Sequence, residues 1–225
     1  MSGLNARAWQ GLVLTVAAMA LALFGSAGTI RYWQGWTYLA VFSTISTAIT
    51  LYLMKHDPAL LARRLKAGPT AEPTTRERII MTLASLGFIG LLVVSGLDRR
   101  FGWSHVSPAL VIAGDVLTLV GFGIIFRVYL ENSYTSGTIE VQPGQTIVTT
   151  GPYAVVRHPM YAGGACYMLA MPLALGSWWG FPVFASFLPV LVWRLLDEEK
   201  LLSRDLPGYV EYLQRVHWRM IPGLF

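Results

Sequence analysis

Cysteine and charged residues are both scarce in this sequence. Of its 225 residues, one is cysteine and 13% are charged, whereas 54% are hydrophobic. The single cysteine, Cys166, excludes an internal disulfide and a zinc site built from clustered Cys and His ligands, so we expect no metal. Soluble domains carry charge at about a quarter of their positions, so the shortage argues against a soluble domain and excludes a disordered chain. The composition therefore favours a polytopic membrane protein.

Long apolar runs divide the chain. A helix needs roughly 20 apolar residues to cross the hydrocarbon core of a bilayer. Four such runs precede the last third of the sequence, at residues 9–30, 33–54, 79–97 and 108–130. We expect each of them to form one transmembrane helix.

A fifth apolar region, residues 160–196, is too long for one span. Glycine and proline interrupt it, and they are the strongest local signals for a turn. We therefore expect a helical hairpin that turns near residues 176–180. The predicted fold is an all-α, polytopic integral-membrane helical bundle with about five to six membrane segments in a single domain, 1–225. Residues 1–130 supply four N-terminal transmembrane helices, and residues 131–225 form the catalytic part.

The basic residues predict the orientation. With the N-terminus placed in the cytoplasm, only three of the 17 Lys and Arg residues fall outside, namely Arg31, Arg99 and Arg100. The positive-inside rule then favours cytoplasmic termini and a cytoplasmic active site, in a membrane that we expect to be the bacterial inner membrane. The net charge is +5, but most of the basic residues lie beside apolar runs, which argues against a nucleic-acid partner.

Three segments are predicted to lie outside the membrane. We interpret residues 55–78 as a solvated loop. Residues 132–153 contain two short β-leaning stretches around Pro143-Gly144, a pair that suits a type II turn, so we expect a short cytoplasmic β-hairpin or loop. The charged tail after Leu196 is predicted to be helical, ending in a short tail helix that starts near Tyr209.

Ionisable residues gather at the two ends of the predicted hairpin. Arg157 and His158 precede it, whereas Arg194, Glu198 and Glu199 lie at its end. Because a hairpin brings its entrance and its exit together, these side chains should face each other at one membrane surface. Pro159 suits the first turn of a helix, whose free N–H groups favour an anionic ligand.

The mixed chemistry of this cluster predicts a zwitterionic ligand with an aromatic ring. Carboxylates could bind an amino group, arginines could bind a carboxylate, and tyrosines such as Tyr153 and Tyr161 could contact the ring. S-adenosylmethionine has this profile. NADPH also has groups that these residues could bind, and composition does not distinguish the two.

Several motifs resemble the isoprenylcysteine carboxyl methyltransferase family, which includes bacterial members and is similar to the membrane phospholipid methyltransferases. They are Gly151-Pro152-Tyr153, the run from Arg157 to Tyr161, Arg194 with Glu198-Glu199, Gly208-Tyr209, and the run from Arg215 to Pro222. The resemblance covers roughly residues 132–225. It implies a helical membrane enzyme that transfers a methyl group from S-adenosylmethionine to a lipophilic or lipid-attached acceptor.

The resemblance also implies roles for individual residues. The cofactor-binding set is Tyr153, Arg157, His158, Tyr161, Glu198 and Glu199, and the catalytic set is Arg194, Glu198 and His158. The acceptor stays open among a prenylcysteine-like carboxylate, an isoprenoid carboxylate and a phospholipid amine.

Two other functions stay open. An NADPH-dependent reductase of sterol-like or polyprenyl double bonds would have a similar C-terminal layout before Ile221-Pro222, although the Glu198-Glu199 pair would repel cofactor phosphates. A non-catalytic membrane scaffold would need no cofactor pocket at all.

Overall fold

The computed structural model describes residues 2–225 and is helical throughout its regular parts. Five helices are long and apolar enough to cross a membrane. They are α1 (Ser2–Ala27), α2 (Trp33–His56), α4 (Thr75–Phe101), α5 (Pro108–Glu131) and α7 (Gly180–Asp205). The shorter helices are α3 (Pro58–Leu65), η1 (Pro69–Ala71), η2 (Gly151–Ala154), α6 (Pro159–Ala174) and α8 (Tyr209–Arg215). The predicted all-α membrane bundle is confirmed.

The helices begin where the sequence offers capping groups. The Asp57 carboxylate accepts a hydrogen bond of 2.8 Å from the Leu60 N–H at the start of α3. Thr74 and Glu77 cap the first turn of α4 reciprocally, which satisfies two N–H groups that have no partner inside the helix. Proline occupies the first position of α3, α5 and α6, where its missing N–H costs nothing.

The predicted C-terminal hairpin is present. Helix α6 ends at Ala174, α7 begins at Gly180, and Gly176 between them has a φ of 69°. Helix α6 has 16 residues, fewer than the roughly 20 needed to span the membrane core. It packs tightly against α5. A Cβ atom added to Gly121 of α5 would lie only 2.8 Å from the Gly163 carbonyl oxygen of α6.

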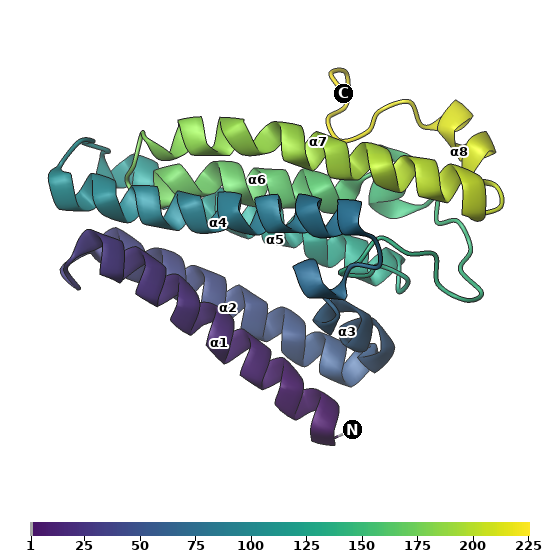
Figure 1. Ribbon diagram of the computed structural model, residues 1–225, viewed down its shortest axis with the longest axis horizontal. Coiled ribbons are helices and arrows are strands. Elements are labelled where there is room, and N and C mark those ends of the chain that lie inside the picture. Colours follow the sequence, from purple (N-terminus) through teal and green to yellow (C-terminus); the bar gives the residue numbers. More distant parts are fainter. Residues whose placement is uncertain (1) are drawn as a thin grey trace.

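The bundle is held together at its centre and at one end. Leu23, Leu91, Met171 and Leu195, which come from α1, α4, α6 and α7, are fully buried in one apolar core. At the end with the hairpin turn, the Asp98 carboxylate accepts short hydrogen bonds from Ser104 and from the Ser177 hydroxyl. The opposite end of the bundle carries α3, α8 and the loop between α5 and η2 (Figure 1).

Two predictions for the segments between the helices need correction. Within residues 132–153 the structure has no strand, so the β-hairpin alternative is wrong and the loop alternative is right. Backbone groups of this loop bond to another segment instead: the Ile139 N–H donates to the Glu72 carboxylate at 3.3 Å. Residues 55–78 are not a solvated loop, because they form α3 and η1 and bury Glu72.

Candidate active site

The two ends of the hairpin meet. The Tyr161 hydroxyl, on the first turns of α6, donates a hydrogen bond of 2.5 Å to the Glu198 carboxylate on α7. Arg157 and His158, just before α6, lie 3.0 Å and 3.3 Å from the Glu199 carboxylate. The turn near Gly176 therefore places the histidine–arginine entrance beside the acidic exit, as the sequence predicts.

A cavity of about 490 Å³ opens between these ends. Its volume falls within the about 300–1,000 Å³ that is typical of small-molecule sites. Six of the seven predicted site residues line it: Tyr153, Arg157, His158, Tyr161, Arg194 and Glu198. Apart from Arg64 and Met81, every lining residue comes from residues 132–212. Both cationic and anionic side chains face this space.

The seventh predicted residue, Glu199, does not line the cavity. Its carboxylate contacts three basic side chains, Arg157, His158 and Arg219 (Nε–Oε2 3.0 Å). Glu199 is 8% exposed. The charge of Glu199 is therefore compensated from several sides, and its position fixes Arg157 and His158 from behind the cavity.

A residue that the sequence did not single out holds Arg194. The Arg194 guanidinium forms an ion pair of 2.8 Å with Glu72, whose side chain is fully buried. Arg194 also donates a hydrogen bond of 3.2 Å to the Gly137 carbonyl. Glu72 follows η1, so the connection between α3 and α4 reaches across to α7 and fixes one wall of the cavity. The signal that could have indicated this is Glu72 itself, an acidic residue between two prolines.

Tyrosines close the cavity on the side of η2 and α8. Tyr212 donates a hydrogen bond of 2.7 Å to the Tyr153 carbonyl, and the Asn132 amide donates one of 3.0 Å to the Tyr153 hydroxyl. Burial raises the pKa of Tyr212 to about 12 and raises that of Tyr153 and Tyr209 further. These phenols are therefore neutral at physiological pH and serve as hydrogen-bonding or stacking groups rather than as bases.

The C-terminal segment completes the site. The N–H groups of Arg157 and His158 donate to the carbonyls of Trp218 and Arg219 at 2.9 Å and 2.8 Å. The Arg219 side chain then reaches Glu199 and lies over the Phe225 ring. Residues 218–219 thus hold the backbone of the motif that precedes α6.

The chemistry of the site is that of a polar pocket without a metal cluster. Among residues 2–225, no group of three or more His, Cys, Asp or Glu side chains could hold a metal ion. What the site offers is a set of charged side chains, two of which, Arg194 and Glu198, face the cavity from α7.

Known proteins match parts of the chain. The model of the phospholipid methyltransferase family matches residues 109–206. A protein-S-isoprenylcysteine O-methyltransferase B from Arabidopsis thaliana is 26% identical over 148 residues, which cover 61% of this chain and 70% of the plant protein. A delta(14)-sterol reductase from Mus musculus is 33% identical over 91 residues, which cover 39% of this chain and only 22% of the reductase.

The matched segment contains most of the cavity. Residues 109–206 include α5, the loop after it, the motif before α6, and α7 with its charged end. The resemblance drawn from the motifs is thereby confirmed: residues 109–206 of this membrane protein are similar to the phospholipid methyltransferase family, and the chain is also similar to an isoprenylcysteine methyltransferase.

Proposed function

We propose that this chain is an integral-membrane methyltransferase that uses S-adenosylmethionine and acts on a lipophilic acceptor. The observation that carries the proposal is the cavity where the entrance and exit of the α6–α7 hairpin meet. It joins the motif from Arg157 to Tyr161 with Glu198, at one end of a bundle of membrane-spanning helices.

The residues of the cavity fit S-adenosylmethionine by their charges. In this proposal Glu198, held by the Tyr161 hydroxyl, binds the amino group or the ribose hydroxyls of the donor. Arg157 and His158 approach its carboxylate, and Tyr153 contacts the adenine ring. Glu199 acts through Arg157 and His158, because its carboxylate contacts both and lies outside the cavity lining.

The reaction needs alignment and exclusion of water more than it needs acid–base groups. The bound donor supplies a methyl group on a sulfonium, which is a good leaving group. The protein must hold an acceptor in line behind that methyl group and keep water out. Arg194, fixed by Glu72 and the Gly137 carbonyl, is placed to orient an acceptor at the cavity wall.

A transfer assay tests the proposal. Purified protein in lipid nanodiscs is incubated with methyl-labelled S-adenosylmethionine and a total lipid extract, and the labelled product is identified by mass. We expect one class of methylated lipid. A Glu198→Gln variant should bind the donor more weakly and turn over more slowly. Unchanged donor affinity and turnover in this variant would remove the role of Glu198.

The similarity to a sterol reductase keeps NADPH reduction as a second candidate. Two basic side chains at the cavity are already paired with carboxylates, Arg157 with Glu199 and Arg194 with Glu72. Such a balanced pocket suits a zwitterion better than a cofactor that carries several phosphates. Calorimetric titration with both cofactors separates the two candidates. Saturable NADPH binding without binding of S-adenosylmethionine would favour the reductase over the methyltransferase.

The roles of the two parts of the chain and its orientation in the membrane are also part of the proposal. Residues 131–225 bind the donor, and residues 1–130 shape the membrane side of the site. Both termini and the cavity face the cytoplasm, in accordance with the distribution of Lys and Arg. Reporter fusions at each terminus should both be active in the cytoplasm, and a periplasmic signal from either would contradict this orientation.

A further inference from the structure

One loop, residues 217–225, turns back from α8 toward the helical bundle, and we call it the tail loop. The main-chain oxygens of Trp218 and Arg219 accept hydrogen bonds of 2.9 Å and 2.8 Å from the N–H groups of Arg157 and His158. These two donors directly precede α6, where the last long apolar region of the sequence begins. Figure 1 shows the end of the chain beside the middle part of α7 rather than beyond its charged end. The tail loop therefore lies at the level where the apolar part of the bundle begins.

The tail loop has an inner and an outer side. Met220 is buried in the main apolar core of the bundle, and Phe225 packs against the same core. A closed turn joins these two residues, because the Met220 N–H donates to the Phe225 main-chain oxygen at 2.9 Å. Trp218, Ile221 and Leu224 are instead 41%, 49% and 75% exposed. The protein thus covers one side of the loop and leaves three large apolar side chains uncovered on the other.

The charges beside the outer side are positive. Arg215, at the end of α8, is exposed and forms no ion pair within residues 2–225. His217 is exposed as well, and the Arg219 side chain stays 34% exposed although its Nε lies 3.0 Å from Glu199. The sequence has no aspartate or glutamate after α8. Exposed apolar and aromatic side chains next to cations are typical of a surface that binds the interface of an anionic bilayer.

The position of the outer side favours the bilayer as its occupant. A bundle with five helices that can span a membrane is surrounded by lipid, so head groups lie beside the tail loop at this level. Tryptophan is enriched at the boundary between membrane and water, because its ring is apolar and its N–H is polar. Anionic head groups attract arginine near the membrane surface. A partner protein would have to compete with lipid for the same surface.

We propose that the tail loop binds the bilayer surface and thereby supports the candidate active site. Trp218, Ile221 and Leu224 insert into the adjacent leaflet, and Arg215 binds the head groups of anionic phospholipids. The loop would bind lipid in this way whatever reaction the cavity performs, so the proposal does not rest on methyl transfer.

Two connections carry the effect of lipid binding to the site. The loop backbone accepts from the N–H groups of Arg157 and His158. The Arg219 side chain binds Glu199, whose carboxylate contacts the same two side chains from behind the cavity. A loop that leaves the leaflet should loosen both connections at once. The order of the motif before α6 should therefore depend on the lipid beside the protein.

The first measurement locates the tail loop. Because Cys166 is the only cysteine, Leu224→Cys in a Cys166→Ser background takes a single fluorescent label, and Val210→Cys on the exposed side of α8 is the matched control. In nanodiscs, we expect lipids with a nitroxide near the head group to quench the label at position 224 and aqueous iodide to quench the label at position 210. Quenching of position 224 by iodide alone would overturn the inference. Shielding of position 224 from both quenchers would indicate a protein partner and overturn it as well.

The second measurement follows amide hydrogen exchange by mass spectrometry in the peptide that contains Arg157 and His158. We expect phosphatidylglycerol, added to phosphatidylcholine nanodiscs, to slow this exchange about fivefold, the effect of one cation at an anionic membrane surface. Arg215→Gln should remove the difference between the two lipids. Arg204→Gln should keep it, because Arg204 is exposed and already paired with Asp205.

Serine substitutions test the apolar contact in the same assay. Ile221→Ser combined with Leu224→Ser should speed the exchange at least about tenfold in either lipid, because less apolar surface holds the loop in the leaflet. Val210→Ser removes an exposed apolar side chain from α8 and should have no effect. Exchange that responds neither to lipid composition nor to the tail-loop variants, or that responds equally to Val210→Ser, would overturn the inference.

These measurements also separate the inference from the proposed function. Protection that depends on lipid and on Arg215, in a protein that binds no S-adenosylmethionine, would refute the methyltransferase and support the lipid-binding loop. Donor binding and methyl transfer, together with exchange that ignores lipid composition and the tail-loop variants, would support the methyltransferase and refute the lipid-binding loop.

Discussion

Replacing Glu72 with glutamine should weaken both the bundle and the site. The Glu72 side chain is fully buried, and its oxygen lies 2.8 Å from the guanidinium of Arg194, which is 12% exposed. With an effective dielectric constant of about 20, this separation corresponds to a Coulomb energy of about 6 kcal/mol before desolvation is subtracted. Removing one partner of a buried pair costs about 3–5 kcal/mol. Because Arg194 keeps its bond to the Gly137 carbonyl, we expect the lower end, about 3 kcal/mol.

The same substitution should change the chemistry. In Glu72→Gln the charge of Arg194 is no longer compensated by Glu72, and Glu198, which lines the same cavity from the same helix, is available to it. The methyl-transfer rate should fall more than protein stability alone explains, and donor affinity should fall with it, because Glu198 leaves its bond to Tyr161. Denaturant unfolding in detergent gives the stability change, and calorimetry and transfer kinetics give the other two.

A double-mutant cycle decides whether the ion pair is the cause. Glu72→Gln, Arg194→Gln and the double variant are compared, with Glu211→Gln on the exposed side of α8 as the control. A coupling energy below about 0.5 kcal/mol, the range found for independent sites, would show that the two residues do not act as a pair. Equal destabilisation by Glu211→Gln would refute the reasoning as well.

Three further predictions concern the packing and the tyrosines. Tyr161→Phe removes the 2.5 Å bond to Glu198 and should weaken donor binding about 10- to 100-fold in calorimetry; unchanged affinity would show that the bond does not position Glu198. Gly121→Ala should cost about 1–3 kcal/mol in unfolding experiments, because its Cβ atom would lie 2.7 Å from the Tyr167 backbone nitrogen, whereas Gly123→Ala, in open space, should not; equal effects would contradict the close packing of α5 and α6. Because Tyr212 has its pKa raised from 10.0 to about 12, the protein should lose stability as the pH rises from about 10 to 12, and Tyr212→Phe should lose less over that interval; an identical alkaline profile would assign the effect to other groups.

Much of the fold follows from local sequence. Long apolar runs predict the spans because a backbone in lipid must satisfy its own hydrogen bonds, which a helix does within one segment. The hairpin was predictable because glycines and prolines interrupt the last apolar region. Once a hairpin was expected, the meeting of Arg157 and His158 with Glu198 and Glu199 followed from its geometry.

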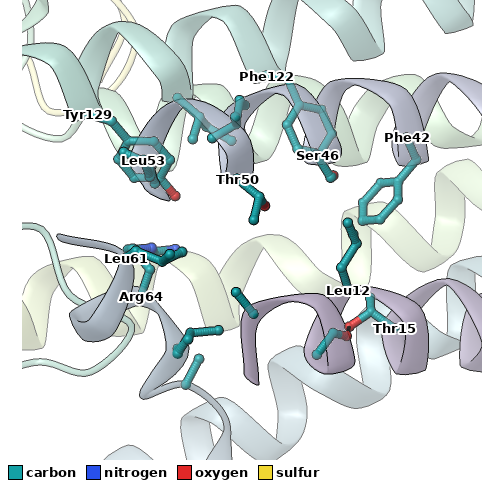
Figure 2. A pocket seen from close by; sticks show the side chains of 16 residues that line it. Leu12, Thr15, Phe42, Ser46, Thr50, Leu53, Leu61, Arg64, Phe122 and Tyr129 are labelled. Carbon is teal, nitrogen blue, oxygen red and sulfur yellow. Dashed lines mark hydrogen bonds between the residues drawn. The ribbon is translucent and has the colours of Figure 1, made fainter. Parts of the chain in front are cut away.

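What could not be predicted depends on partners that are distant in the sequence. Glu72 is buried against Arg194 and the Ile139 N–H, both far along the chain. The β-leaning stretches of residues 132–153 do not pair, because an isolated two-stranded hairpin is marginal in water and Ile139 donates to Glu72 instead. The cavity of about 380 Å³ that α1, α2, α3 and α5 line (Figure 2) had no signal either, since its lining is ordinary and mostly apolar sequence from four helices.

The backbone bonds from Arg157 and His158 to Trp218 and Arg219 have a consequence for biosynthesis. The membrane helices can insert one after another as they emerge from the ribosome, but these two bonds must wait for a segment that follows α8. Any product truncated before Trp218 would embed in the bilayer and still lack the support of its histidine–arginine motif. If the proposed methyl transfer holds, donor would therefore be consumed only by chains translated through that segment.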